Sequence, residues 1–173
     1  MGIFLTFAKY NQEANKTILE LLNGLSNDER EKERGSFYHS LSGLVRHTGG
    51  GTLFFAGLFR GALGPSPAAK PLATLEKISL PEGTLDPSAW KQAAADIEAI
   101  DQALVDFAAA LTDADLAAPV KLDWYGGNPP DVPLSFMFLQ LTAHNTHHRG
   151  QVSQILDELK IDNDYSGINV AFR

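Results

Sequence analysis

The residues best suited to chemistry lie in one segment, residues 141–151, which holds three of the chain's five histidines. Apolar residues recur here at helical spacing. We therefore expect a helix in which His144 and His148, four positions apart, lie on the same face. Two imidazoles on a core-facing apolar stripe are costly unless each has a partner. Hydrogen bonds to neighbouring side chains are one solution, and ligation of a divalent metal ion is another.

A zinc-type site needs a third protein ligand, and a second segment can supply it. This segment also repeats apolar residues at helical spacing, and Ser36 could cap the helix that it forms. By the helical wheel, His47 falls on the inward face of that helix, whereas His39 lies at the rim. We therefore predict a three-histidine metal site composed of His47, His144 and His148.

The glycines Gly49, Gly50 and Gly51 follow His47 directly. Each glycine inside a helix costs roughly 1 kcal/mol relative to alanine, so a run of three calls for a reason. Close approach of a neighbouring backbone, a local distortion, room for a ligand and a plain helix break are all compatible with it.

Composition restricts the class of protein. With 173 residues the chain is long enough for one domain and too short to expect two, so we predict a single domain over residues 1–173. A net charge of −7 argues against a nucleic-acid partner, and the absence of cysteine excludes thiolate chemistry on the protein. No apolar run approaches the ~20 residues of a membrane span, and no signal peptide is evident. We expect a cytoplasmic protein without a membrane partner.

Four long segments with helical periodicity predict an all-α fold, a four-helix bundle. They cover about residues 3–25, 36–60, 87–112 and 133–160. The proline-rich stretch 61–86 shows few signals of regular structure but can travel the length of a helix. It favours one long crossover between the second and third helices over a simple up-down-up-down order. Weak alternation in residues 120–125 allows a short hairpin.

The element His144-x-x-x-His148-Arg-Gly-Gln151, together with His47, resembles the DinB-like (DinB/YfiT) superfamily of metal-binding bundles. Similar to the same family are Tyr10-Asn11 with Ala14-Asn15, Ser40 and Gly43, and the run from Asp101 to Phe107. The resemblance covers almost the whole chain. It implies an up-down-down-up topology, a Ni²⁺ or Zn²⁺ ion held by the three histidines, and a homodimer. It also implies that His147 is not a ligand, in agreement with its position off the apolar stripe.

The sequence departs from this family at Thr52 and Phe55, where many relatives carry an acidic residue and a tryptophan. Three histidines without an obvious fourth ligand leave a coordination position for water or substrate, as in catalytic sites. Our first hypothesis is a metal-dependent enzyme with a solvent-reaching pocket over the metal. The resemblance implies a thiol S-transferase or hydrolase that acts on a small molecule or thiol. The alternative is a metal-stabilised structural or stress-response module without turnover.

Outside the three ligands, Asp101, Asn11 and Gln151 lie on or near inward faces and could accept the second N–H of a ligand histidine. Each could equally be a buried polar residue bound to a helix end or water. We expect Arg149 to point off the stripe into an ion pair, and Gly150 to allow a neighbouring helix to approach closely.

Overall fold

Four long helices pack lengthwise against one another in the computed structural model, which describes residues 2–123 and 130–172. They are α1 (Ile3–Asn23), α3 (Leu41–Leu63), α5 (Pro87–Ala110) and α7 (Leu134–Glu158). The predicted all-α bundle is confirmed. In the described part of the chain, the only strands are β1 (Pro119–Val120) and β2 (Val132–Pro133). They pair antiparallel, with Val120 opposite Val132. No described helix is long and apolar enough to cross a membrane.

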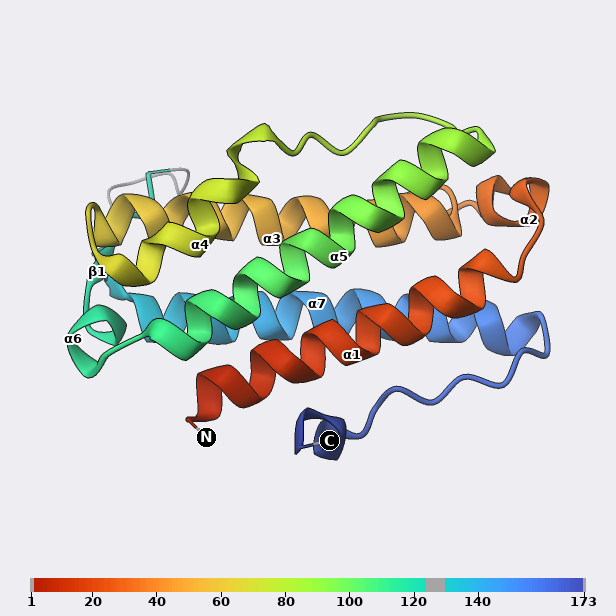
Figure 1. Cartoon of the computed structure of the whole chain (residues 1–173). Helices are drawn as coiled ribbons and strands as arrows, with labels where there is room; N and C mark the ends of the chain where they lie inside the picture. Colours follow the sequence, from red (N-terminus) through yellow and green to blue (C-terminus); the bar gives the residue numbers. More distant parts are fainter. Residues whose placement is uncertain (1, 124–129, 173) are drawn as a thin grey trace.

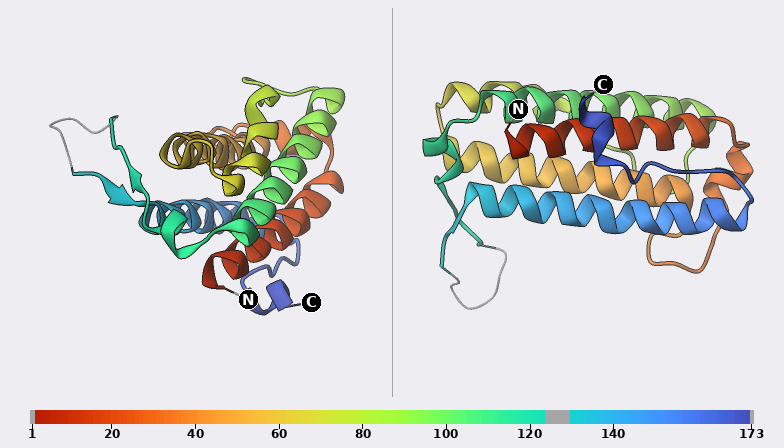
Figure 2. Two further views of the ribbon diagram at one scale, coloured as in Figure 1. Left: turned by 60° about the vertical axis from the view of Figure 1, so that its left-hand side comes forward. Right: turned by 90° about the horizontal axis from the view of Figure 1, so that it is seen from below.

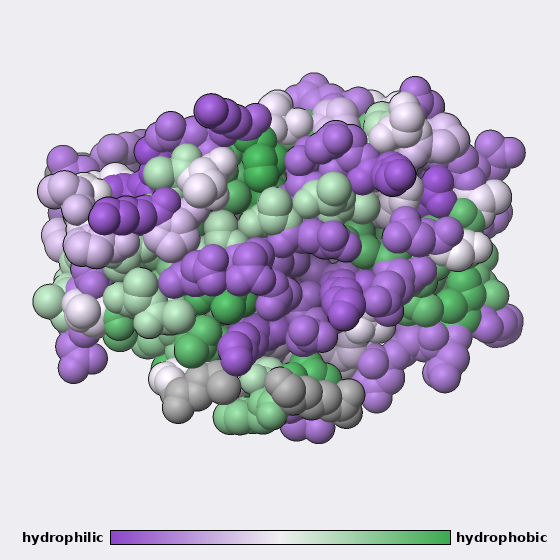
Figure 3. All heavy atoms as spheres, in the orientation of Figure 1, coloured by the Kyte–Doolittle hydropathy of each residue, from purple (hydrophilic) through white to green (hydrophobic). Residues whose placement is uncertain are grey.

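The helices associate as two antiparallel pairs, α3 with α7 and α1 with α5. In Figure 1, α1 and α7 run in one direction and α3 and α5 in the other. The connection from α3 to α5 therefore runs back along the bundle. On the face that Figure 3 shows, hydrophilic side chains follow the helices with hydrophobic ones between them, as expected of amphipathic helices.

The α3 helix begins at Leu41 rather than at Ser36. Its N-cap is Ser40, whose hydroxyl accepts a hydrogen bond from the amide of Gly43 at 3.1 Å. The preceding residue, His39, has a φ of 65°, which an α-helix cannot contain. The predicted start at Ser36 is wrong because the chain turns at His39. The exposed His39 side chain bonds to Glu33 instead.

The crossover contains more regular structure than its prolines suggested. Three short helical turns occupy its first half, namely η1 (Pro67–Ala69), α4 (Lys70–Ala73) and η2 (Thr74–Lys77). Ser66 caps the first of them, with proline at the following position. Leu72 and Leu75 are buried in the core, so apolar contacts hold this segment on the bundle.

The remaining elements are short. The α2 turn (Asn27–Glu31) is capped by Ser26, whose side chain accepts a hydrogen bond from the amide of Glu29, and α6 is Asp113–Leu116. After α7, the chain runs back along α1 and ends in η3 (Ile168–Phe172), as Figure 2 shows.

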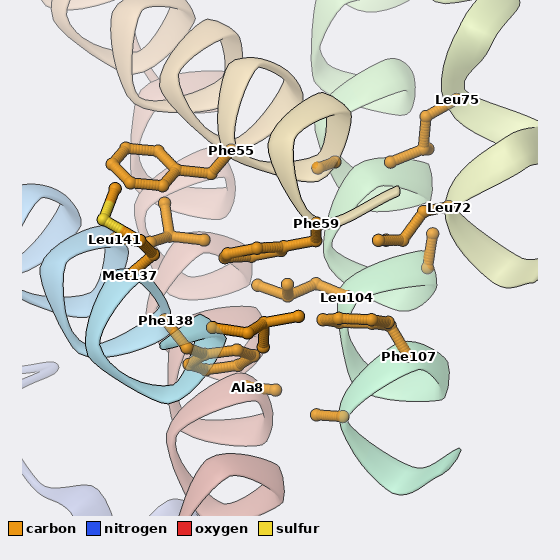
Figure 4. Packing of buried hydrophobic residues seen from close by; sticks show 14 of the residues in the cluster. Ala8, Phe55, Phe59, Leu72, Leu75, Leu104, Phe107, Met137, Phe138 and Leu141 are labelled. Atoms are coloured by element: carbon orange, nitrogen blue, oxygen red, sulfur yellow. The ribbon is translucent and has the colours of Figure 1, made fainter. Parts of the chain in front are cut away.

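Two large apolar clusters form most of the core, one toward each end of the bundle, and a small third cluster joins Tyr10, Ala14 and Ala171. In the first, the nearly parallel rings of Phe59, Phe107 and Phe138 lie together, with ring centroids 5.4 to 6.4 Å apart (Figure 4). Between the two clusters lie five polar side chains that are at most 8% exposed. We call them the polar layer: Asn11, Asn15, Asp101, Asn145 and Arg149. Buried polar groups of this kind require hydrogen-bond partners.

Candidate metal centre

The three predicted histidines come together between α3 and α7. One ring nitrogen from each lies within 4.8 Å of the others, and Nε2 of His47 is 3.0 Å from Nε2 of His144. Three nitrogens at tetrahedral positions about 2.0–2.1 Å from a zinc ion would be about 3.3 Å apart. Small side-chain rotations thus suffice to bring the three nitrogens to one ion. We call His47, His144 and His148 the histidine cluster.

Two of these imidazoles are oriented by side-chain oxygens. Nδ1 of His148 lies 2.7 Å from Oε1 of Gln151, and Nδ1 of His144 lies 3.0 Å from Oδ1 of Asn145. An oxygen acceptor at Nδ1 favours the tautomer that carries its proton there. The lone pair of Nε2 then remains free for a metal ion.

Electrostatics favour the neutral form of His47 and His148. Burial, together with the neighbouring His148 and His144, lowers the pKa of His47 to about 4. Burial is also the main reason that the pKa of His148 is lowered. Neutral imidazoles are the form that binds metal, so these two ligands do not need to lose protons near neutral pH.

Gly51 makes room for the cluster. A Cβ at this position would lie 2.6 Å from Cε1 of His144, closer than real contacts allow. At Gly49 a Cβ would meet Leu80 and Ile97, whereas at Gly50 it would meet nothing within 4 Å. The helix continues unbroken through all three glycines, so a helix break there is wrong. Close packing explains Gly49 and Gly51, and no contact explains Gly50.

An aromatic side chain covers one side of the cluster. The ring of Tyr38 stacks on His47 with centroids 4.0 Å apart and meets His148 edge-on at 5.2 Å. His148 is only 6% exposed, while His47 and His144 are partly exposed. Solvent therefore reaches the cluster from the side of His47 and His144.

A groove of about 460 Å³ lies beside the cluster rather than over it. Its lining combines apolar and polar side chains, among them Leu44, Ile155, Tyr38, Gln151 and His147. Tyr38 and Gln151 contact the histidine cluster, but none of the three histidines lines the groove. His147 is exposed, faces this groove and does not belong to the cluster.

Of the further candidates, Gln151 touches a cluster histidine and the other two do not. Asp101 accepts hydrogen bonds from Nδ2 of Asn11 at 2.7 Å and from Nδ2 of Asn15 at 2.9 and 3.1 Å. Asn11 in turn is linked to His144 only through Asn145. Sequence reasoning missed Asn145. Its position four residues after Leu141 and four before Arg149, all three buried, was the signal that could have found it.

Two expectations for the end of this element are wrong. Arg149 is not off the stripe but only 3% exposed. It bonds to the oxygens of Asn11, Asn15 and Thr146 rather than to a carboxylate, and it lies 5.0 Å from the Tyr10 ring centroid. Gly150 is exposed, and a Cβ there would meet nothing within 4 Å. No neighbouring helix approaches it, because the adjacent Arg149 takes the inward position.

A helical bundle whose helices bring three imidazoles together defines a class of proteins able to hold a divalent cation between helices. The chain belongs to the DinB family, whose model matches residues 1–159. Neither a curated protein nor a solved structure matches the chain. The family match ends just after α7, so the segment that returns along α1 lies beyond it.

Proposed function

We propose that this protein binds a divalent transition-metal ion, Zn²⁺ or Ni²⁺, through His47, His144 and His148. The observation that carries the proposal is the convergence of three imidazole nitrogens within 4.8 Å. No aspartate, glutamate or further histidine of the described ranges joins this group. An all-imidazole donor set suits Zn²⁺ and Ni²⁺ better than Mg²⁺ or Ca²⁺, which prefer oxygen ligands.

We propose further that the bound ion serves an enzyme, with thiol-dependent S-transfer and hydrolysis as the reaction classes. An ion with an open coordination position would supply Lewis-acid chemistry, lowering the pKa of a water or thiol. The chain itself supplies orientation, through Asn145 on His144 and Gln151 on His148. Tyr38 shields one face of His47 from water, and the adjacent groove offers space for a small molecule.

One observation favours the alternative, a metal-stabilised structural or stress-response module. His148 is almost fully buried, and the ligands join only α3 and α7. An ion there would fasten these two helices whether or not a substrate ever binds. A cytoplasmic location and a homodimer remain part of the proposal, and the molar mass in solution tests the second.

Metal analysis of the purified protein, followed by titration with Zn²⁺ and Ni²⁺, tests the metal proposal. We expect one ion per chain in the wild type and none in His144→Ala. No saturable binding of either ion would refute it. Chelation then separates the two functions: an intact fold with loss of thiol-transfer or hydrolytic activity supports the enzyme. Collapse of the helical circular-dichroism signal, with no activity before chelation, supports the module.

A further inference from the structure

The polar layer connects the histidine cluster to a carboxylate that touches none of its members. Nδ1 of His144 faces Oδ1 of Asn145 at 3.0 Å, and Nδ2 of Asn145 donates to Oδ1 of Asn11 at 3.0 Å. Nδ2 of Asn11 then donates to Oδ1 of Asp101 at 2.7 Å. From His144 to Asp101, every link in this series has its acceptor on the Asp101 side.

The direction of the series is fixed at Asn11 by two groups with opposite hydrogen-bonding capacity. A guanidinium can only donate, and Nη1 of Arg149 lies 2.6 Å from one end of the Asn11 amide. The carboxyl group of Asp101 lies at the other end, where its ionised form can only accept and its protonated form still offers an acceptor oxygen. The amide of Asn11 therefore presents its oxygen to Arg149 and its nitrogen to Asp101. The reverse orientation would place donor against donor and acceptor against acceptor.

The orientation of the Asn145 amide, whose side chain is 1% exposed, follows from that of Asn11. The oxygen of Asn11 requires a donor, so Asn145 must present its nitrogen. Thr52 favours the same orientation more weakly: its hydroxyl donates to the carbonyl of Thr48 and accepts from Nδ2 of Asn145 at 3.2 Å, but a hydroxyl can also rotate and donate. The remaining oxygen of Asn145 faces His144, which must then carry its proton on Nδ1.

We propose that Arg149 and Asp101, acting through Asn11 and Asn145, are positioning residues that hold His144 as the tautomer with a free Nε2. This inference rests on the proposed metal function, because a free Nε2 is what a metal ion needs at this ligand. The series excludes the competing tautomer, in which a proton on Nε2 would point at His47 and block ligation. The orienting group of a metal ligand thus lies three hydrogen bonds away, on α5.

A matched pair of variants separates this directed role from simple stabilisation. Asn11 and Asn15 lie one turn apart on α1, both are buried, and both bond to Asp101 and Arg149. Only Asn11 also bonds to Asn145. Asn11→Leu and Asn15→Leu therefore remove similar contacts from the polar layer, but only the first interrupts the series.

The measurement is the tautomer of His144 in the metal-free protein, read from the ¹⁵N shifts of its ring at a pH where it is neutral. We expect a single tautomer with an unprotonated Nε2 in the wild type and in Asn15→Leu, and a mixture in Asn11→Leu. Affinity for Zn²⁺ should fall about 10-fold in Asn11→Leu, as for other outer-shell partners of metal ligands. It should change little in Asn15→Leu.

A wild-type His144 protonated on Nε2, or equal effects of the two variants, would overturn the proposal. If Asn11→Leu does not fold, Asn145→Ala removes the oxygen that faces His144 and leaves the Arg149 side intact. A single unprotonated-Nε2 tautomer in Asn145→Ala would also refute the proposal. Because the tautomer is read without metal, failure of the wild type to bind Zn²⁺ would refute the metal function and leave the tautomer result standing.

Discussion

The histidine cluster joins two helices, α3 and α7, whereas the polar layer joins α1, α5 and α7 at the same level of the bundle. In the polar layer, amide, guanidinium and carboxylate groups are hydrogen-bonded to one another, and each bond joins a donor to an acceptor. In the cluster, three imidazole nitrogens lie close together, and the pKa values of two of these histidines, His47 and His148, are lowered. The difference fits a layer that holds its geometry and, under the proposed function, a cluster that receives a cation.

Removal of a cluster histidine should have the largest effect on metal binding. We expect His47→Ala, His144→Ala and His148→Ala each to lower Zn²⁺ affinity by more than ~100-fold, because losing a ligand exceeds the 10–100-fold effect of losing an outer partner. Isothermal titration measures the change. His147→Ala is the control and should bind as the wild type does. A His47→Ala variant with full metal content and an unchanged melting temperature would contradict the three-histidine site.

Removal of a member of the polar layer should instead lower the stability of the metal-free protein. Arg149→Met deletes a buried cation and leaves the Asp101 carboxylate without it, so we expect a loss of about 3 kcal/mol in unfolding free energy. Urea denaturation of the metal-free protein measures it. The reference is His144→Ala, which should change the stability of the metal-free protein by less than Arg149→Met. If the two variants are equally destabilised, the division of roles between layer and cluster is wrong.

The histidine cluster could be predicted from the sequence better than the polar layer, because its residues follow from spacing within single helices. His144 and His148 lie on one helix, so the spacing of four residues places them together. His47 required only the inward face of a second helix. The links from Asn145 to Asn11 and Asp101 depend instead on how three helices are rotated and set in register, which no local period encodes. Arg149 was misplaced for the same reason: two of its three hydrogen-bond partners, Asn11 and Asn15, lie on α1, far away in sequence.

The fold shows the same contrast. Periodicity located the four long helices, but the start of α3 was wrong because His39 adopts a left-handed conformation that side-chain patterns do not reveal. The helical turns from Pro67 to Lys77 were missed because prolines suggested irregular structure, although Leu72 and Leu75 are buried there. The hairpin considered possible over residues 120–125 lies partly outside the described residues. Of its described part, Val120 belongs to a strand, β1, and pairs with Val132 of β2, beyond the predicted segment.

A methyl group added beside His144 tests whether the geometry of the histidine cluster matters for Zn²⁺ binding. Gly51→Ala should lower Zn²⁺ affinity about 10-fold, because the new methyl group would displace the His144 ring from its position. Gly50→Ala is the matched control in the same helix, since its methyl group meets nothing within 4 Å. It should bind Zn²⁺ normally and gain slightly in stability. Equal affinities of the two variants would show that His144 can move without loss of binding.

In the metal-free protein, the stability contributions of the two regions should change with pH in opposite directions. The pKa of His47 is lowered from 6.5 to about 4. Its contribution to stability is therefore present above pH 6.5 and lost as the pH falls toward 4. The pKa of Asp101 is raised from 3.8 to about 7, chiefly by burial and against the lowering effects of Asn15 and Arg149. Its contribution is present below pH 3.8 and lost as the pH rises to 7.

The stability contributions of His47 and Asp101 oppose each other between pH 4.5 and 6.5. A variant at either residue makes the contribution of that residue measurable. Compared with the wild type, His47→Gln should lose less stability when the pH is lowered across this window, because the depressed imidazole no longer takes up a proton on unfolding. Asp101→Asn should lose more, because the wild type gains from protonating Asp101 in the folded state and the variant cannot. Urea denaturation at pH 4.5, 5.5 and 6.5 gives the slopes. If both variants depart from the wild type in the same direction, the two regions do not titrate oppositely.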